Sequence, residues 1–361
     1  MGLPNIFIEF VKAAVASITV GATGVVGVIL QDATALVGGS MLSDANAIPA
    51  GLTTANKRYL NEVFMGAPQK VFLYVVDGTA ETVSYDDAFS YFTLHRCNYI
   101  CGDPAITSTL RAALVTFVKS KRTSGKQAPK AVVPGGSTAE DHEGVIDVKF
   151  TGGSTVKAGT TTYTAAELCG RIAGILAGLD LTQSATYYAL DEITEIPEAT
   201  DDEISTAIDN GFLTLYDTGS AIVIGRAVTS LKTVTASKTA DLKKIKIVAI
   251  QDMIIMDLMD TINKNYIGKY SNSYDNKCLL LAAIRGYFME LERRGYLMAG
   301  RSTIDINVDK QRRYLQSKGI DTSGMDEQAI KTANTDSHVF LAGSVGILDA
   351  IEDVDIVINK E

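Results

Sequence analysis

Residues 69–78 read QKVFLYVVDG, and this stretch determines the fold expected for the first half of the chain. All six residues from Val71 to Val76 are apolar or aromatic, and the pair Asp77–Gly78 that follows them is a common turn signal. A continuous apolar run of this length, closed by a turn, predicts a strand that is buried on both faces. Strands of that kind belong to parallel sheets covered by helices.

Strand and helix patterns alternate around this segment. Further strands are expected at three places: 25–30, 97–103 and 129–136. Helices are expected at 85–94 and 107–125, and the second of them ends with Lys121, Arg122 and a glycine stop at Gly125. The alternation predicts an α/β layer with parallel strands, in a chain of mixed α/β and α+β character.

The character of the sequence changes in residues 144–164. Two strand patterns flank Gly152–Gly153–Ser154 there, which predicts a β-hairpin with a glycine turn. Two capping boxes, in which a threonine and a glutamate cap the first backbone amides of a helix, predict helix starts: Thr164 with Glu167, and Thr200 with Glu203.

The helix expected at 165–180 carries glycines at every fourth position: Gly170, Gly174 and Gly178. Each of them destabilises a helix by about 1 kcal/mol relative to alanine. Because the three share one ridge of the helix, we expect another element to approach its backbone closely there.

Two long helices are expected in the last third of the chain, at about 251–266 and 276–297. Apolar residues at helical spacing predict the buried stripe of the second helix: Leu280, Ile284, Tyr287 and Leu291. Three aspartates in and near the first helix raise the question of a metal site: Asp252, Asp257 and Asp260. Because Asp260 and Lys264 are spaced for an i,i+4 ion pair, a solvated helix face is the preferred interpretation.

The composition narrows the functional classes. A chain of 361 residues suffices for two or three domains, and its 46% hydrophobic and 21% charged residues are ordinary for a globular protein. The net charge of -9 argues against a nucleic-acid-binding surface over the whole molecule, while a local basic patch is left open. The start of the chain lacks the basic region of a signal peptide, and Glu9 and Lys12 interrupt its apolar stretch.

The triplet Asp217–Thr218–Gly219 matches the active-site motif of aspartic peptidases. That chemistry requires two carboxylates that share one proton, so a homodimer with two facing Asp217 side chains would be needed. The alternative is a hairpin turn, because strand-like residues precede and follow the triplet. We prefer the turn.

Other chemical signals are weak. Cys97 and Cys101 lie near His95, but their Cys-x3-Cys spacing has no second cysteine pair, so buried reduced thiols are expected instead of a zinc site. The glycine-rich stretches lack the lysine of a phosphate loop, and we therefore expect no cofactor.

Both ends of the chain have strand character. The alternating or clustered apolar residues are Ile6, Phe7, Ile8 and Phe10 at one end, and Val354, Ile356, Val357 and Ile358 at the other. An exposed apolar strand is a liability, because its unpaired backbone groups recruit other chains. Either both strands pair within their own subunit, or each completes a sheet in a neighbouring copy. These residues alone do not decide between the two solutions.

The order of elements resembles the sheath proteins of contractile phage tails, most closely those of Gram-positive prophages and R-type phage-tail-like bacteriocins. The resemblance rests on five segments of the sequence: 2–10, 144–190, 225–233, 244–277 and 349–361. It implies a structural subunit without enzymatic activity or cofactor. Such subunits stack as sixfold rings around a tail tube and contract to drive the tube through a bacterial envelope. The alternative is a non-contractile tail or adaptor protein of the same particle, which would form one ring and not a long tube.

The same resemblance implies an assembly scheme and partners. Residues 1–22 and 350–361 would be strand arms exchanged between subunits, 23–237 an outer α/β domain, and 238–349 a tube-facing domain that the N-terminal arm joins. The implied partners are further copies of the chain, the tail tube protein, the baseplate and the tail terminator, without nucleic acid or membrane insertion. Assembly would take place in the host cytoplasm, and the product would be a virion tail or a bacteriocin particle.

A basic cluster in the tube-facing domain is the candidate contact to the tube: Arg285, Arg293, Arg294, Arg312 and Arg313. The alternative is an ordinary solvated helix surface. A contact with an acidic partner is the functional interpretation.

Overall fold

The computed structural model of the chain describes residues 18–21, 23–32, 36–236 and 238–359. Its contacts define two compact units. The larger comprises residues 21–256 together with the end of the chain from Leu348 onward, and the smaller comprises residues 257–347 with the described residues 18–20. Each unit is described separately below.

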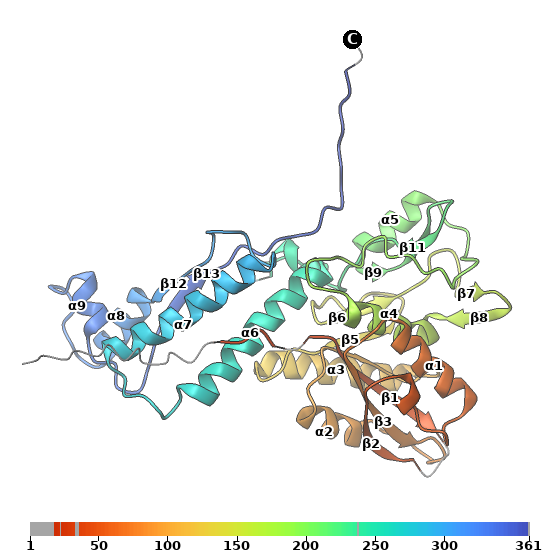
Figure 1. Ribbon diagram of the computed structural model, residues 1–361, viewed down its shortest axis with the longest axis horizontal. Coiled ribbons are helices and arrows are strands. Elements are labelled where there is room, and N and C mark those ends of the chain that lie inside the picture. The colour runs from red at the N-terminus through yellow and green to blue at the C-terminus, as the bar shows by residue number, and fades with distance from the viewer. Residues whose placement is uncertain (1–17, 22, 33–35, 237, 360–361) are drawn as a thin grey trace, which may run out of the picture. The chain divides into compact units, whose positions relative to one another are not determined.

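A seven-stranded sheet forms the centre of the larger unit (Figure 1). Its strands lie in the order β2-β3-β1-β4-β5-β6-β9, and only β2 runs antiparallel to its neighbour. Their bounds are β1 Val25–Asp32, β2 Gly38–Leu42, β3 Lys70–Asp77, β4 Tyr99–Cys101, β5 Lys130–Pro134, β6 Val145–Val148 and β9 Phe212–Leu213. The parallel α/β layer expected from the sequence is therefore confirmed.

Helices cover both faces of this sheet, so that β1 is buried on both faces. Val26, Val28 and Leu30 pack with α1 and α4, while Val25 and Ile29 pack with α2 and α3. The helical elements of this unit up to residue 243 are η1 Ala45–Ala47, α1 Thr54–Met65, α2 Asp86–Leu94, α3 Ser108–Ser124, α4 Ala165–Gly178, α5 Asp201–Asp209 and η2 Ala240–Lys243. Both predicted capping boxes are present, at the starts of α4 and α5.

The glycine ridge of α4 lies against α1. A side chain built on Gly170 would collide with the Tyr59 ring, and one on Gly174 would overlap the backbone carbonyl of Val63. At Gly178 it would overlap the carbonyl oxygen of Gly66, just after α1. The predicted close backbone approach is confirmed, and it explains why this helix accepts three weak helix formers.

The glycine hairpin predicted around Gly152–Ser154 is wrong. The strand before it, β6, is buried in the central sheet between β5 and β9. The strand after it, β7 (Thr155–Ala158), pairs instead with β8 (Thr161–Thr164), so the hairpin turn lies six residues later. Two parallel neighbours hold β6 inside the sheet, and this long-range pairing overrides the local glycine signal.

Helix α6 spans Ile245–Asn265 and so begins about six residues before the predicted start. The predicted solvated face is wrong for Asp252 and Asp257, which are buried, whereas Asp260 is exposed as expected. Asp252 is buried, where it accepts two hydrogen bonds from the Arg122 guanidinium (2.8 and 2.9 Å) and one from Lys130 Nζ (2.6 Å). Burial lowers the pKa of Lys130, opposed by the nearby Asp252 carboxylate.

Four helices and a two-stranded sheet make up most of the smaller unit: the end of α6, α7 Tyr274–Arg293, α8 Val308–Ser317, α9 Glu327–Thr332, and the antiparallel pair β12 Thr303–Ile306 and β13 Leu341–Ser344. The buried stripe predicted for α7 is confirmed at all four positions. Asp257 is buried here as well, and accepts a hydrogen bond of 2.7 Å from the Tyr287 hydroxyl. Within the described ranges, no helix combines the length and apolar character needed to cross a membrane.

Candidate assembly site

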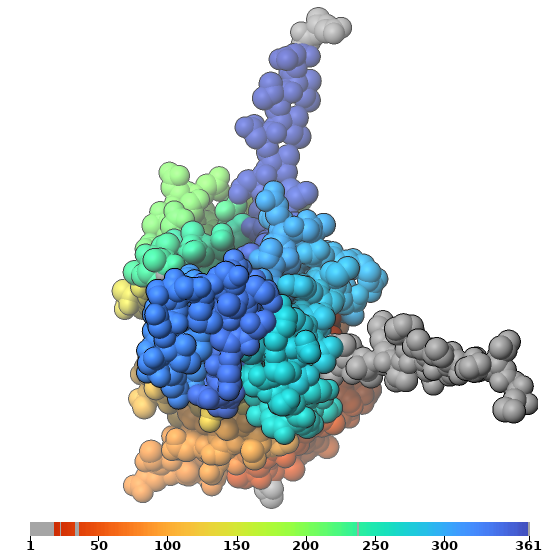
Figure 2. Space-filling model, turned by 90° about the vertical axis from the view of Figure 1, so that its left-hand side faces the viewer, coloured from red at the N-terminus to blue at the C-terminus, as the bar shows by residue number. Residues whose placement is uncertain are grey.

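The C-terminal arm, defined here as residues 354–359, leaves the larger unit as an extended segment (Figures 1 and 2). All four apolar residues predicted for the strand arm are strongly exposed: Val354 by 70%, Ile356 by 71%, Val357 by 83% and Ile358 by 86%. Ordinary monomers seldom expose so many adjacent apolar side chains, and such patches mark interaction surfaces. None of the described residues covers them.

The segment that precedes the arm is held firmly. Glu352 Oε1 accepts hydrogen bonds from Ser184 Oγ (3.0 Å) and Thr186 Oγ1 (2.7 Å), and its side chain is only 5% exposed. Asp353 pairs with Arg226 at 2.6 Å, and Asp349 pairs with Lys244. We call residues 349–353 the arm root. The sequence analysis did not identify it, because its partners lie more than 100 residues away along the chain.

The other predicted arm falls outside the described residues. Ile6, Phe7, Ile8 and Phe10 all lie in residues 1–17, so their role in strand exchange stays a prediction.

Strand β13 has an open edge. It pairs with β12 on one side, and no described strand pairs with it on the other. Asn307 N–H donates to the Phe340 carbonyl, so the alternation of an antiparallel ladder turns the backbone groups of Leu341 and Gly343 toward the open edge. The opposite edge of β12 is partly covered, because the Arg285 guanidinium donates to the Ile304 carbonyl (2.9 Å).

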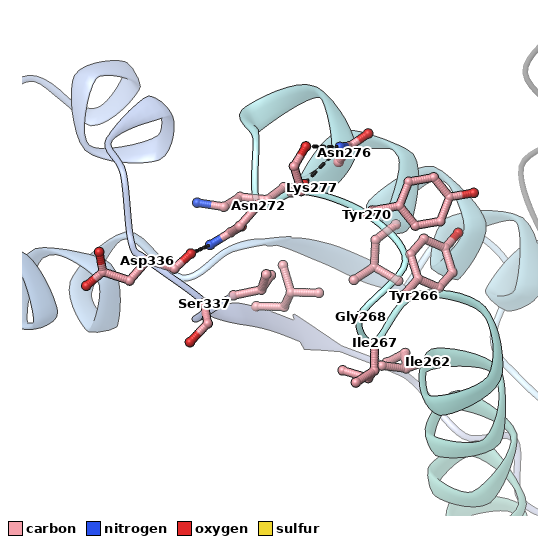
Figure 3. A pocket seen from close by; sticks show the side chains of 14 residues that line it. Ile262, Tyr266, Ile267, Gly268, Tyr270, Asn272, Asn276, Lys277, Asp336 and Ser337 are labelled. Atoms are coloured by element: carbon pink, nitrogen blue, oxygen red, sulfur yellow. Dashed lines mark hydrogen bonds between the residues drawn. The ribbon is translucent and has the colours of Figure 1, made fainter.

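A pocket of about 690 Å³ lies in the smaller unit, where the end of α6, the start of α7 and β13 meet (Figure 3). Tyr266 and Tyr270 stand side by side in its wall, with ring centroids 5.4 Å apart. Val339 and Leu341, which alternate along the chain at the start of β13, contribute apolar side chains. An apolar hollow beside an unpaired strand edge is suited to receive the side chains of an added strand.

The polar rim of this pocket is organised by hydrogen bonds within the unit. Asn272 donates from its side-chain amide to the carbonyls of Asp336 (2.8 Å) and His338 (2.9 Å). Lys277 is buried and donates to Thr335 Oγ1 at 3.1 Å, and its burial lowers the pKa of the ammonium group. These contacts fix the loop before β13 against the start of α7.

The predicted tube-contact arginines lie on two helices. Arg285, Arg293 and Arg294 belong to or end α7, and Arg312 and Arg313 belong to α8. Arg293 and Arg294 both pair with Glu290 at 2.7 Å, and Arg293 remains exposed. Their contact with a tube stays a prediction.

The triplet with Asp217 forms a turn. Asp217 ends β10 (Leu215–Asp217), which pairs with β11 (Ile222–Ile224), and its carboxylate accepts a hydrogen bond of 2.8 Å from Gly219 N–H. The hairpin interpretation is thereby confirmed. Cys97 and Cys101 are buried free thiols, and burial raises the pKa of Cys101 to about 12, which keeps it protonated and unreactive.

Two family models match consecutive parts of the chain. The central domain of phage tail sheath proteins matches residues 78–230, and the C-terminal domain of the same proteins matches residues 237–359. The second match includes the open edge of β13, the arm root and the C-terminal arm.

Similar proteins and structures agree with these matches. A tail sheath protein of Clostridium phage phiCD119 is 33% identical over 365 residues, which cover 98% of each chain. The crystal structure of a sheath tail protein from Desulfitobacterium hafniense has a TM-score of 0.68 at 18% identity, over 84% of this chain and 94% of that one. The contracted helical sheath of the anti-feeding prophage has a TM-score of 0.71 at 11% identity, over 100% of both chains. The chain therefore belongs to the phage tail sheath protein family, and its role is that of a structural sheath subunit.

Proposed function

We propose that this chain is the repeating subunit of a contractile tail sheath, which polymerises as stacked sixfold rings around a tail tube. Contraction of the sheath would drive the tube through a bacterial envelope. Family membership supports this role, and the single observation that carries it is the exposed apolar C-terminal arm. A folded subunit that leaves four adjacent apolar positions in water is complete only when another molecule covers them.

The arm becomes buried by adding a strand to the open edge of β13 in a neighbouring subunit. The backbone groups of Leu341 and Gly343 would pair with those of the arm, as in other cases of β-strand addition. Val354, Ile356 and Ile358 alternate, so they share one face of an added strand. That face would be directed at the apolar pocket beside Val339 and Leu341.

This contact joins different surfaces of two identical chains. A donor arm on one copy and an acceptor edge on the next make a heterologous contact, and such contacts propagate into rings or helical arrays. The N-terminal residues 1–22 would add a second exchanged strand. The same scheme leaves residues 23–237 as the outer domain and places 238–349 toward the tube.

The driving energy of contraction would reside in two packings of the same subunit. Strand pairing at the arms keeps neighbours connected while the units reorient, because a short extended segment tolerates rotation at its ends. Further partners are the tail tube protein, the baseplate and the tail terminator. Assembly in a host cytoplasm would precede incorporation into a virion tail or a bacteriocin particle.

The central experiment removes residues 354–361 and leaves the arm root in place. We expect a soluble chain whose free energy of unfolding is unchanged. The apolar side chains of the arm are at least 70% exposed, so they bury little surface in their own subunit. The truncated chain should form no tubes in negative-stain electron microscopy and no fast-sedimenting species. Tubes of normal length from this variant would contradict the proposal.

A matched control removes exposed apolar side chains elsewhere. Met41 and Met65 are 58% and 52% exposed in the larger unit, so the double substitution Met41→Ser and Met65→Ser lowers surface hydrophobicity without touching the arm. This control should still assemble. If the control variant also fails to assemble, the loss of tubes reflects a general decrease in surface hydrophobicity and not the loss of strand exchange.

The tube contact is tested by reversing charge at Arg293 and Arg294, which are free of contacts to the backbone of β12, unlike Arg285. We expect the variant Arg293→Glu with Arg294→Glu to lose co-assembly with the tube protein while sheath polymers still form. The reversal Lys126→Glu, at an exposed position after α3, is the control. Unchanged tube binding in the double variant would remove the basic cluster from the proposal.

A further inference from the structure

The arm root gathers three carboxylates within five residues. Asp349, Glu352 and Asp353 lie in an irregular segment without helix or strand, so no secondary structure keeps them in place. Side-chain contacts do so instead. Each of the three acids has at least one partner on the body of the larger unit.

Glu352 is the centre of this arrangement. Its Oε1 receives the two hydroxyl hydrogen bonds from Ser184 and Thr186. Its Oε2 faces two cations, with Lys244 Nζ at 3.4 Å and Arg226 Nε at 3.8 Å. Hydrogen bonds to an ionised and nearly buried carboxylate are stronger than those between neutral groups.

The partners come from three separate segments of the fold. Ser184 and Thr186 lie in the loop after α4, Arg226 follows β11, and Lys244 precedes α6. These segments are themselves connected, because Ala227 N–H donates to Thr186 Oγ1 (3.0 Å) and Ile245 N–H donates to the Ala227 carbonyl (3.1 Å). The segments that carry the partners of the carboxylate therefore form one hydrogen-bonded platform on the larger unit.

Exposed and partly buried residues alternate along the root, and Ile351 within it is 89% exposed. Glu352 is nearly buried, and every residue from Asp353 to Asn359 is exposed. Figure 1 shows the last segment of the chain running away from the body as an extended stretch.

We propose that Glu352 is the anchor that fixes where, and in which direction, the C-terminal arm leaves its own subunit. This inference rests on the proposed function, because the anchor matters only if the arm is donated to a neighbour. The arm extends beyond Asp353, while the root remains attached to the larger unit. A pull on the arm by the neighbour is then transmitted to the platform around Ser184 and Arg226.

An anchored arm has a thermodynamic advantage over a free one. Fixing the root in advance restricts the positions that the arm explores, so less conformational entropy is lost when it binds its acceptor. The extended arm beyond Asp353 can still rotate when neighbouring subunits change their relative orientation.

The test uses the full chain with Glu352→Ala and Glu352→Gln, below the concentration at which it polymerises. A spin label on Ile351→Cys, in a Cys278→Ser background that leaves only the three buried cysteines, reports the mobility of the root. We expect both variants to mobilise the label. Amide exchange of Ala350, whose N–H donates to Asp349 Oδ1 (2.8 Å), should accelerate on the order of tenfold, the effect of losing one charge-assisted contact.

The control is Asp355→Asn, which removes a carboxylate of the exposed arm only two residues beyond the root. It should change neither the label nor the exchange rates. In polymerisation, Glu352→Ala should raise the concentration needed for tube formation by about tenfold, because the arm must then be ordered during binding.

The outcomes separate this inference from the proposed function. Unchanged root mobility and exchange in Glu352→Ala would overturn the anchor, whatever the polymers do. Tubes from the chain that lacks residues 354–361 would overturn the proposed strand exchange, while the root measurements on the monomer would still stand. A mobile root with an unchanged polymerisation threshold would show that the anchor has no role in arm donation and would overturn it as well.

Discussion

Helix α4 and the C-terminal arm are both apolar, yet their surroundings are opposite. In α4, ten consecutive residues from Leu168 to Ala177 are buried, and a glycine ridge lets α1 approach its backbone. In the arm, every residue from Val354 to Asn359 is exposed. The first segment stabilises the fold of one subunit, whereas the second is left for contacts between subunits. Substitutions in the two regions should therefore affect different measurements.

The largest effect is expected from Gly174→Leu in α4. A side chain there overlaps the Val63 carbonyl, which is backbone and cannot rotate away, so α1 and α4 would have to separate. We expect a loss of more than about 4 kcal/mol in the free energy of unfolding, enough to prevent accumulation of folded protein. Soluble yield, circular dichroism and urea unfolding measure it.

The matched control is Gly286→Leu in α7. This glycine lies midway along the helix on its exposed face, and a side chain built on it meets no atom within 4 Å. Leucine is the better helix former, so the control should gain about 1 kcal/mol. Equal losses at Gly174 and Gly286 would mean that the α1–α4 contact does not decide the result, because helix propensity alone favours leucine at both positions.

The second-largest change in the free energy of unfolding is expected from replacing a buried aspartate, Asp252, and is compared with that of an exposed one, Asp355. Asp252→Asn leaves Arg122 and Lys130 without their buried carboxylate, and removing one partner of such a cluster costs about 3–5 kcal/mol. Asp355→Asn in the arm should leave the unfolding free energy unchanged. Chemical denaturation of both variants provides the comparison, and a cost below about 1 kcal/mol for Asp252→Asn would contradict the role given to the cluster.

The sequence indicates features that depend on local spacing. The capping boxes, the glycine ridge of α4 and the apolar stripe of α7 are each set by residues within a few turns of one another, and all three were predicted correctly. The parallel layer followed from the alternation of elements, which is also a local pattern. Periodicity carries this information because one face of each element must be buried.

Features that depend on distant partners were missed. The buried position of Asp252 follows from Arg122 and Lys130, which precede it by 130 and 122 residues. Glu352 likewise depends on Ser184 and Thr186, at separations of 168 and 166 residues. The arm could be predicted, because the alternation of its apolar residues is a local pattern. The root that holds the arm could not be predicted, because its partners are distant in the sequence.

A smaller effect is expected from His142, which lies in the loop before β6 and accepts a hydrogen bond at Nδ1 from Gly144 N–H (2.9 Å). Burial lowers its pKa from 6.5 to about 4, although Glu143 opposes the shift. Between these values the unfolded chain binds a proton that the folded chain does not. Stability should therefore fall as the pH decreases from 6.5 toward 4, by at most about 3 kcal/mol from this group.

The variant His142→Asn keeps a hydrogen-bond acceptor and removes the titration. We expect its unfolding free energy to depend less steeply on pH in this window than that of the unmodified chain, with the two curves parallel above pH 7. Carboxylates titrate in both proteins, so the difference between the curves isolates the histidine. Curves that stay parallel down to pH 4 would show that His142 is readily protonated in the folded chain.

The smallest effect on stability, and the most informative for assembly, is expected in the arm. Ile356→Ser and Val357→Ser should each leave the unfolding free energy within about 0.5 kcal/mol of that of the unmodified chain, because both side chains are already in water.

The effects of these two substitutions on assembly should differ. If the arm becomes a strand over the pocket of a neighbour, Ile356 faces the pocket with Val354 and Ile358, whereas Val357 faces away. Loss of one buried isoleucine then raises the critical concentration for tube formation by about tenfold or more, and Val357→Ser raises it less. Sedimentation of polymers across a concentration series measures both thresholds. Equal shifts would mean that the arm does not dock with one face, and the acceptor would then have to enclose it from both sides.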